Sequence, residues 1–304
     1  MPPPKGTFNI LEGPGDYVVT TAVHSETYPA ISPLNVNLAS RAVFITGASR
    51  GLGASIAISY ARAGASHIAL GARSDLTSTV TSILEAAKAA NRPKPTVLPV
   101  QLDISNPQSV ERAAELVKSK FGRLDIVVNN AGVLNGMGHK ITDSNPDEWW
   151  SNYEVNVKGP YLILRSFIPL LLATEDGLKT VSTVASVGAL IATDGTSGYQ
   201  ASKWAVMKLA DHAMSEYRDQ GLVTFNVHPG NIHTTMLDGE LPDILKPVFI
   251  DTPELTGDAM VYLTSEKRDW LAGRYINLTW DLPELMGKKD EIVEKDLLKV
   301  KLTF

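Results

Sequence analysis

Cysteine is absent from this sequence of 304 residues. Disulfide bonds, cysteine metal ligands and a cysteine nucleophile are therefore excluded, and the composition agrees with a cytoplasmic protein, the location that we expect. Long hydrophobic runs are absent as well, since no stretch of about 18 apolar residues occurs. Residues 1–5, which include three prolines and a lysine, lack the apolar core of a signal peptide. We therefore expect neither a membrane partner nor secretion.

Positive charge is also scarce. The chain has 28 Lys and Arg against 33 Asp and Glu, a net charge of −5, and no basic block. Proteins that bind nucleic acid usually carry a basic patch or stripe, so nucleic acid is not expected as a partner. The histidines His139, His228 and His233 lack the spacing of metal ligands on one element, and no carboxylate cluster joins them. We therefore expect no metal site.

The chain divides into three parts by pattern. Residues 1–40 contain Pro, Gly and Tyr without periodicity, and we interpret them as an N-terminal arm on the surface or on a partner subunit. A partly disordered tail is the alternative. Residues 41–280 are expected to form one domain. Residues 281–304 contain apolar positions that suggest an amphipathic tail helix.

From residue 41 onward, short apolar runs alternate with amphipathic segments, and the runs show no alternation between apolar and polar residues. Such strands are typical of a parallel sheet that helices cover on both faces. The predicted fold class is therefore α/β, a doubly wound parallel sheet (Rossmann fold) of about seven strands. The predicted strands are 42–46, 67–70, 97–102, 124–129, 180–184, 222–227 and 275–278, and the predicted helices are 52–64, 79–90, 107–121, 149–172 and 197–219.

A glycine-rich turn, residues 46–53, joins the first predicted strand to the first helix. Gly47 permits the tight turn, Gly51 lets the backbone approach a pyrophosphate, and Gly53 lets helix and strand pack closely. The helix N-terminus then offers free N–H groups and partial positive charge to phosphates. An ordinary glycine-rich turn would look the same, but the strand–turn–helix setting favours a dinucleotide site.

The residues after the second predicted strand favour NADP(H) over NAD(H). A carboxylate about 20 positions after the turn would accept the ribose 2′-hydroxyl of NAD, but none occurs here before Asp75. Arg73 stands at that place, and Arg50 lies inside the turn. Two guanidinium groups can hold a 2′-phosphate through charge-assisted hydrogen bonds. Two solvated surface arginines are the alternative.

Tyr199 and Lys203 are four residues apart, so they share one face of a predicted helix. A nearby cation favours the phenolate and lowers the pKa of the phenol, which can then exchange a proton near neutral pH. Ser186 precedes Tyr199 by 13 residues and can hydrogen-bond a substrate oxygen, and Asn156 can hold a water that reaches Lys203. Such residues are often structural when isolated. Here their order, each near the end of a predicted strand, favours a catalytic set.

Together these features resemble the classical short-chain dehydrogenase/reductase family, over about residues 41–278, and its NADP(H)-dependent ketoreductases in particular. The resemblance implies that Tyr199 is the acid/base, that Lys203 lowers its pKa and holds the nicotinamide ribose, and that Ser186 orients the carbonyl. Asn156 would support a proton-relay water. The cofactor-binding residues that it implies are Gly47, Ser49, Arg50, Gly51, Leu52, Gly53, Arg73, Asp103, Ile104, Asn130, Ala131, Gly132, Tyr199, Lys203, Pro229, Gly230, Ile232 and Thr234.

Two departures from the family concern the chain ends. The family usually has a Gly-Gly pair shortly after the last strand, whereas residues 278–281 read Leu-Thr-Trp-Asp here. A charged tail and an added N-terminal arm accompany this change. In the family this end often helps to build a tetramer, and the altered ends put that assembly in doubt. We expect a homo-oligomer and prefer a dimer to a tetramer, because the family associates through the helices that contain Asn156 and Tyr199.

Apolar residues are expected to form the substrate pocket. Leu134, Met137, Val187 and Met236 are the candidate wall residues, and Tyr153 is an additional one. The long segment 235–256, which contains Leu237, Leu241, Ile244, Leu245, Val248 and Phe249, suits a mobile lid. The same apolar residues could instead pack on each other. The pattern predicts a largely apolar substrate that carries a ketone.

The predicted function is therefore the NADPH-dependent reduction of a ketone to a secondary alcohol on a small molecule. Alcohol oxidation with NADP and imine reduction are alternatives that use the same residues. A non-catalytic NADP-binding sensor is a third alternative. Sensors tend to lose the tyrosine or the lysine, and both are present here.

Overall fold

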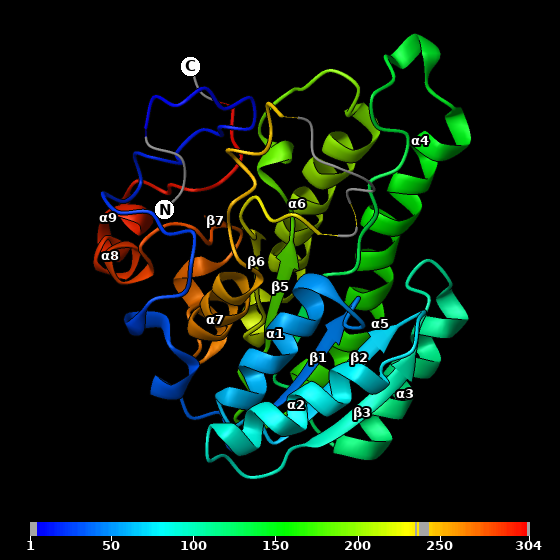
Figure 1. Ribbon diagram of the computed structural model, residues 1–304. Helices are drawn as coiled ribbons and strands as arrows, with labels where there is room; N and C mark the ends of the chain where they lie inside the picture. Colours follow the sequence, from blue (N-terminus) through cyan, green and yellow to red (C-terminus); the bar gives the residue numbers. More distant parts are fainter. Residues whose placement is uncertain (1–4, 235, 237–242, 303–304) are drawn as a thin grey trace.

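The computed structural model describes residues 5–234, 236 and 243–302. Its strands form one sheet in the order β3-β2-β1-β4-β5-β6-β7, and every neighbouring pair is parallel (Figure 1). This confirms the predicted doubly wound α/β fold. The strands are β1 (Ala42–Thr46), β2 (His67–Ala72), β3 (Thr96–Gln101), β4 (Ile126–Asn129), β5 (Thr180–Val184), β6 (Val223–His228) and β7 (Tyr275–Asn277).

Burial explains why these strands lack alternation. Every residue of β1, β4, β5, β6 and β7 is buried, because helices cover both faces of the sheet. The exception is β3, which lies at the edge of the sheet and exposes part of its length. An edge strand also tolerates Pro99, which has no N–H to donate.

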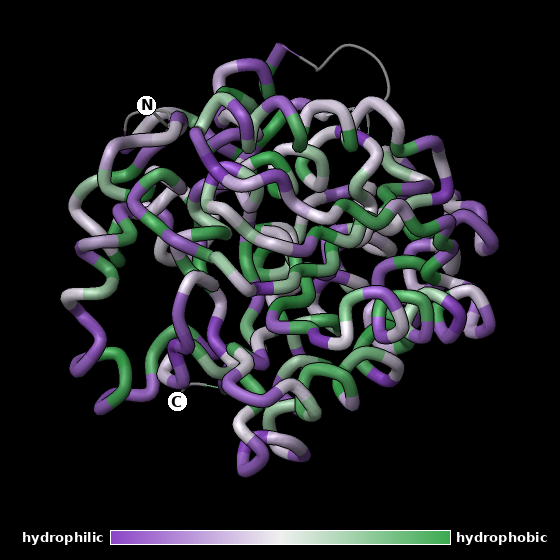
Figure 2. The backbone as a smooth tube through the Cα atoms, turned by 90° about the horizontal axis from the view of Figure 1, so that it is seen from below, coloured by the Kyte–Doolittle hydropathy of each residue, from purple (hydrophilic) through white to green (hydrophobic). Residues whose placement is uncertain are grey.

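The helices form two layers. On one face α1 packs against α2 and α7, and on the other α3 packs against α5, with α6 beside it. Each layer closes its own hydrophobic core against the sheet. In Figure 2 the hydrophobic segments gather in the middle of the molecule and the outer turns are mostly hydrophilic. The bounds are α1 (Gly51–Arg62), α2 (Thr77–Ala89), α3 (Pro107–Phe121), α5 (Gly159–Ala173), α6 (Ser197–Tyr217) and α7 (Pro253–Thr264).

The helix predicted at 149–172 is not one regular helix. It consists of α4 (Pro146–Tyr153), a π-helical turn (Glu154–Lys158) and α5. The whole run, Pro146–Ala173, has the length and apolar composition of a membrane-spanning helix, but 56% of its most apolar window is buried inside the protein. Leu162 and Phe167 of α5 belong to the core against the sheet. The apolar composition therefore reflects a core helix.

The described parts of the N-terminal arm and the C-terminal tail lie side by side (Figure 1). Val23 forms an antiparallel bridge with Trp280, and the Thr21 N–H donates to the Glu284 carboxylate. Ile31, in a short 3₁₀ turn of the arm, is fully buried. The tail contains two short helices, α8 (Leu282–Gly287) and α9 (Lys289–Glu294), where the sequence predicted one. The described arm, residues 5–40, thus packs on its own chain.

Candidate functional site

A cavity of about 720 Å³ opens at the carboxyl edge of the sheet. It collects residues from the ends of β1, β2, β4, β5 and β6, as expected for a parallel sheet whose order reverses beside β1. The predicted catalytic and cofactor-binding residues line this cavity, with the exception of Gly53 and Asn156. The cavity is therefore the candidate active site.

The turn after β1 has the geometry expected of a phosphate site. Gly47 and Gly51 have positive φ angles of 68° and 57°, which favour glycine. A Cβ on Gly53 would collide with the carbonyl oxygen of Gly47, so the turn closes onto α1 only without one. α1 begins at Gly51 and points its free N–H groups toward the cavity. The residues present fit the diphosphate of a dinucleotide.

The loop after β4 is joined to this turn by hydrogen bonds. The Thr46 hydroxyl accepts from the N–H groups of Asn130 and Ala131, each at 3.0 Å. The Asn130 amide donates in return to the carbonyl of Thr46 at 2.9 Å. Asn130 thus fixes two neighbouring loops at the bottom of the cavity, and Ala131 and Gly132 line its floor.

Arg50 and Arg73 lie at one end of the cavity, and both are exposed. Among the described residues, neither makes an ion pair with a carboxylate. Asp103 lies nearby; its hydrogen bond from the Ser105 hydroxyl, and more weakly the charge of Arg73, lower the pKa of its carboxyl. Ser49, Leu52 and Ile104 complete this end. It therefore presents two available guanidinium groups.

Tyr199 and Lys203 lie on the first turns of α6, opposite Ser186 after β5. The Tyr199 phenol hydrogen-bonds the Ser186 hydroxyl, and the Lys203 Nζ lies 5.7 Å from the centre of the Tyr199 ring. Ser186 also caps the next short turn by accepting from the Gly188 N–H at 3.0 Å. The three side chains therefore meet at one point of the cavity wall.

Burial affects the pKa values of both Tyr199 and Lys203. Burial raises the pKa of the Tyr199 phenol, and the hydrogen bond from Ser186 opposes the shift only in part. The Lys203 Nζ donates to the Val184 carbonyl at 2.8 Å and lies over the Tyr199 ring. Burial in turn lowers the pKa of Lys203 to about 8.

Asn156 falls in the π-helical turn between α4 and α5. Its side-chain oxygen accepts from the Val133 N–H at 2.9 Å, while its amide donates to the Val133 carbonyl at 2.9 Å and to Ser202 at 3.0 Å. Both amide hydrogens are therefore used to join the loop after β4 to α6. π-helical turns often occur at functional sites. Gly132 separates Asn156 from Lys203, since a Cβ there would lie 3.1 Å from the Asn156 oxygen and 3.4 Å from the Lys203 Nζ.

The loop after β6 forms the next part of the wall, with Pro229, Gly230, Ile232 and Thr234. Gly230 has φ of 103°, and the Asp251 carboxylate packs where its Cβ would stand. That carboxylate accepts from the Asn231 N–H at 2.6 Å, and burial raises the pKa of Asp251 to about 6. Sequence reasoning missed Asp251, which lies 20 residues from the loop that it holds.

The histidines do not gather. His228 lines the cavity, and burial lowers the pKa of its imidazole to about 3, so it is neutral. His139 and His233 are exposed and lie outside the cavity lining. Within the described residues, no group of three or more His, Asp or Glu side chains is placed to hold a metal ion.

Leu134, Met137, Val187 and Met236 line the other end of the cavity, and Ile244, Leu245 and Phe249 join them. Tyr153 does not line it, because its ring stacks on Trp149 and Trp150. The predicted lid, 235–256, extends too far: α7 begins at Pro253, and Thr256 is buried. Val248 is buried outside the lining, and Leu237 and Leu241 lie outside the described residues.

Two wall residues come from a segment with no signal in the sequence. Ile10 and Leu11 of the N-terminal arm line the cavity. The arm has neither periodicity nor a motif. Nothing in the sequence therefore indicated that these residues lie near Val187, which is more than 170 positions away. Gln200 was also missed, and its amide holds the Thr193 turn by accepting from the Thr193 N–H at 3.0 Å.

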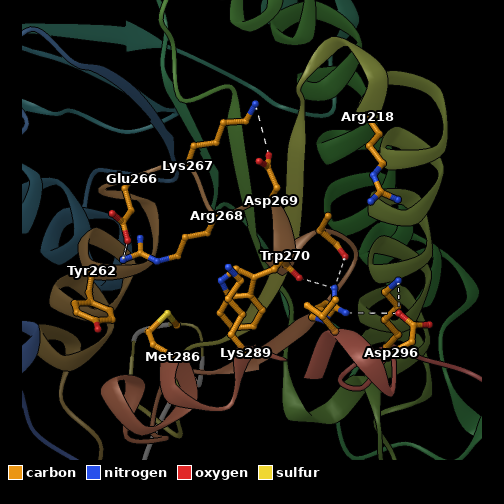
Figure 3. A pocket seen from close by; sticks show the side chains of 14 residues that line it. Arg218, Tyr262, Glu266, Lys267, Arg268, Asp269, Trp270, Met286, Lys289 and Asp296 are labelled. Carbon is orange, nitrogen blue, oxygen red and sulfur yellow. Dashed lines mark hydrogen bonds and ion pairs between the residues drawn. The ribbon is translucent and has the colours of Figure 1, made fainter. Parts of the chain in front are cut away.

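A second cavity, of about 880 Å³, lies near the opposite ends of β6 and β7 (Figure 3). Its lining is strongly charged, but most of those charges are paired within the protein. Lys267 pairs with Asp269, Arg268 with Glu266, and the Arg274 guanidinium donates to backbone carbonyls. It shares no residue with the first cavity.

Comparisons with known proteins agree with this geometry. Residues 41–244 match a family model described as short chain dehydrogenase. The chain therefore belongs to the short chain dehydrogenase family, oxidoreductases that bind a nicotinamide cofactor and act on CH–OH or carbonyl groups of small molecules.

Particular relatives are similar over most or all of their length. The chain is 54% identical to "Short chain dehydrogenase pigC" of Monascus ruber over 308 residues, which cover both chains completely. It is 46% identical to "Short chain dehydrogenase mpl6" of Monascus purpureus over 92% of this chain and 94% of that one. Among solved structures, an alcohol dehydrogenase from the archaeon Thermococcus sibiricus, complexed with 5-hydroxy-NADP, is 27% identical with a TM-score of 0.65. That match covers 78% of this chain and 95% of the other.

Proposed function

We propose that this protein uses NADPH to reduce a ketone on a largely apolar small molecule to a secondary alcohol. The observation that carries the proposal is the meeting of Tyr199, Ser186 and Lys203 between a cationic end and an apolar end of one cavity. A dinucleotide with an extra phosphate fits the first end. A carbonyl compound with apolar substituents fits the second.

In this proposal the substrate carbonyl oxygen lies between the Tyr199 and Ser186 hydroxyls. Ser186 donates a hydrogen bond that orients the carbonyl. Tyr199 gives its phenolic proton to the oxygen as the carbonyl carbon receives the hydride that bound NADPH supplies. Lys203, whose pKa of about 8 keeps it largely protonated at neutral pH, stabilises the phenolate that remains. Burial raises the pKa of Tyr199 and so keeps the phenol protonated, with a proton to give.

The NADP preference rests on Arg50 and Arg73. Both are exposed at the cavity, and neither forms an ion pair with a carboxylate of the described residues. A 2′-phosphate would accept charge-assisted hydrogen bonds from both guanidinium groups, whereas a 2′-hydroxyl would not. Asp103, which is held by Ser105 and stays ionised, would contact the adenine amine.

We also propose that the protein is a homodimer that associates through α5 and α6 and acts in the cytoplasm. The exposed faces of these helices carry Tyr161 and Trp204, which are 49% and 48% exposed. Large exposed aromatic residues are enriched at protein interfaces. Light scattering of the wild type and of Trp204→Glu tests this part, because the charge would leave a monomer.

The experiment that tests the activity is fluorescence titration with NADPH and NADH, followed by NADPH consumption with a panel of methyl ketones. Tight NADPH binding, weak NADH binding and turnover of a ketone are expected. Preference for NADH would contradict the cofactor assignment, and binding without turnover of any ketone or of the corresponding alcohols would favour the sensor.

A further inference from the structure

The N-terminal arm reaches the candidate active site, although it lies outside the part of the chain that matches the family model. Ile10 and Leu11 line the cavity beside the apolar end described above. The backbone of Gly13 packs directly on Val187, since a Cβ on Gly13 would overlap the Val187 Cγ2. Val187 follows Ser186, so the arm touches the wall one residue from the proposed carbonyl site.

Hydrogen bonds hold this part of the arm in place. The Asp16 carboxylate accepts from the Gly13 N–H at 2.8 Å and from the Asn277 amide, at the end of β7, at 3.0 Å. The Asn9 side chain accepts from the Leu11 N–H at 2.8 Å. Residues 9–16 therefore form a compact turn tied to the sheet.

The anchor on the tail is Trp280. Its indole N–H donates to the Gly15 carbonyl at 3.2 Å, and its ring is 1% exposed. The tryptophan and the arm are therefore parts of one arrangement, since the ring packs under the turn that the arm places over the cavity.

We propose that residues 9–16 are a substrate-recognition element, in which Leu11 and Ile10 contact a bulky apolar substituent of the ketone. Asp16 is a positioning residue, since it holds the turn and does not line the cavity. This inference rests on the proposed ketone reduction. It assigns the arm a ligand class: an alkyl or aryl group large enough to reach from Ser186 to the arm.

The first test compares methyl ketones that share one reacting group, namely acetone, acetophenone and benzylacetone. The ratio of kcat/KM for benzylacetone to that for acetone should fall about tenfold in Leu11→Ala, the effect of losing apolar contact in a pocket. Val18→Ala is the matched control, because Val18 is on the same arm, is 73% exposed and lies outside the cavity lining. Its ratio should equal that of the wild type.

The second test separates the positioning role of Asp16 from the contact that Leu11 makes with the substrate. Asp16→Ala should lower the same ratio through KM, and Asp16→Asn, which keeps an acceptor for the Gly13 N–H, should restore part of it. Calorimetry measures the binding of benzylacetone without turnover when the protein is the NADPH complex of Tyr199→Phe. The measurement is made with and without Leu11→Ala. Weaker binding in the double variant is expected.

The outcomes separate the two proposals. If the wild type turns over the panel and Leu11→Ala keeps the wild-type ratio, the role of the arm is wrong and the proposed reduction stands. If the wild type neither turns over nor binds any of the three ketones, the proposed function and the role of the arm are both overturned.

Discussion

The two ends of the cavity are built in different ways. The cofactor end consists of short loops at strand ends, such as residues 46–53 and 129–132, which hydrogen bonds join to each other. The substrate end collects residues from the arm, from the loops after β4, β5 and β6, and from residues 243–249. The cofactor end is therefore encoded by local motifs. The substrate end depends on segments that meet only when the whole chain has folded.

The largest expected effect concerns the point where the two ends meet. Tyr199→Phe should lower kcat by about 100-fold to 10,000-fold, because it removes a general acid. The Kd of NADPH should stay within about twofold, since the ring and Lys203 remain. Rapid kinetics and fluorescence titration check the two parts separately. A variant that keeps wild-type kcat would remove the proposed role of the phenol.

The next effect concerns the anchor of the substrate end. Trp280→Ala removes a fully buried ring, and such a change typically costs about 3–5 kcal/mol of unfolding free energy. Urea unfolding measures this loss. In the folded variant, kcat/KM for benzylacetone should fall while NADPH affinity is retained, because the ring lies under the arm and away from the phosphate turn. Equal losses of kcat/KM for benzylacetone and of NADPH affinity would contradict the separation of the substrate end from the cofactor end.

The third prediction concerns the cofactor end alone. Arg50→Ala and Arg73→Ala should each weaken NADPH binding by about 10-fold to 100-fold, the usual worth of a charge-assisted hydrogen bond. NADH binding should change little. Arg112→Ala, an exposed arginine of α3 outside the cavity, is the matched control. Parallel losses of NADPH and NADH affinity in the two variants would show that neither arginine reads the 2′-phosphate.

The smallest effect concerns the boundary between the two ends, where Asp251 holds the loop after β6. Its pKa is raised from the ordinary value to about 6 in the folded protein. The stability that this raised pKa contributes is present below pH ~4, near the unfolded value, and is lost as the pH rises through about 6. The free energy of unfolding of Asp251→Asn, relative to that of the wild type, should therefore rise by on the order of 1–2 kcal/mol between pH 4 and pH 7. Thermal unfolding at both pH values checks it.

The same contrast explains what the sequence could predict. The parallel sheet followed from strands without alternation, and α3 was predicted with its observed bounds because Asn106 caps it, Pro107 begins it and Gly122 ends it with φ of 68°. The predicted cofactor residues also gather at one edge, because strand ends and glycine turns fix them locally.

Other features depend on long-range packing that no local pattern carries. Ile10 and Leu11 reach the cavity through Trp280 and Asn277, more than 260 positions away. The Tyr153 ring stacks on Trp149 and Trp150 and therefore does not line the cavity. The raised pKa of Tyr199 follows from burial, which spacing alone does not reveal.

The central claim is that the two ends of the cavity bring NADPH and a ketone together at Tyr199. The most direct measurement incubates the wild type with benzylacetone and NADPH deuterated at the nicotinamide C4, in separate reactions for the two faces, and analyses the alcohol by mass spectrometry. Deuterium on the carbinol carbon with one label only is the predicted result. Cofactor that binds but leaves no deuterium in an alcohol with either label would contradict the account.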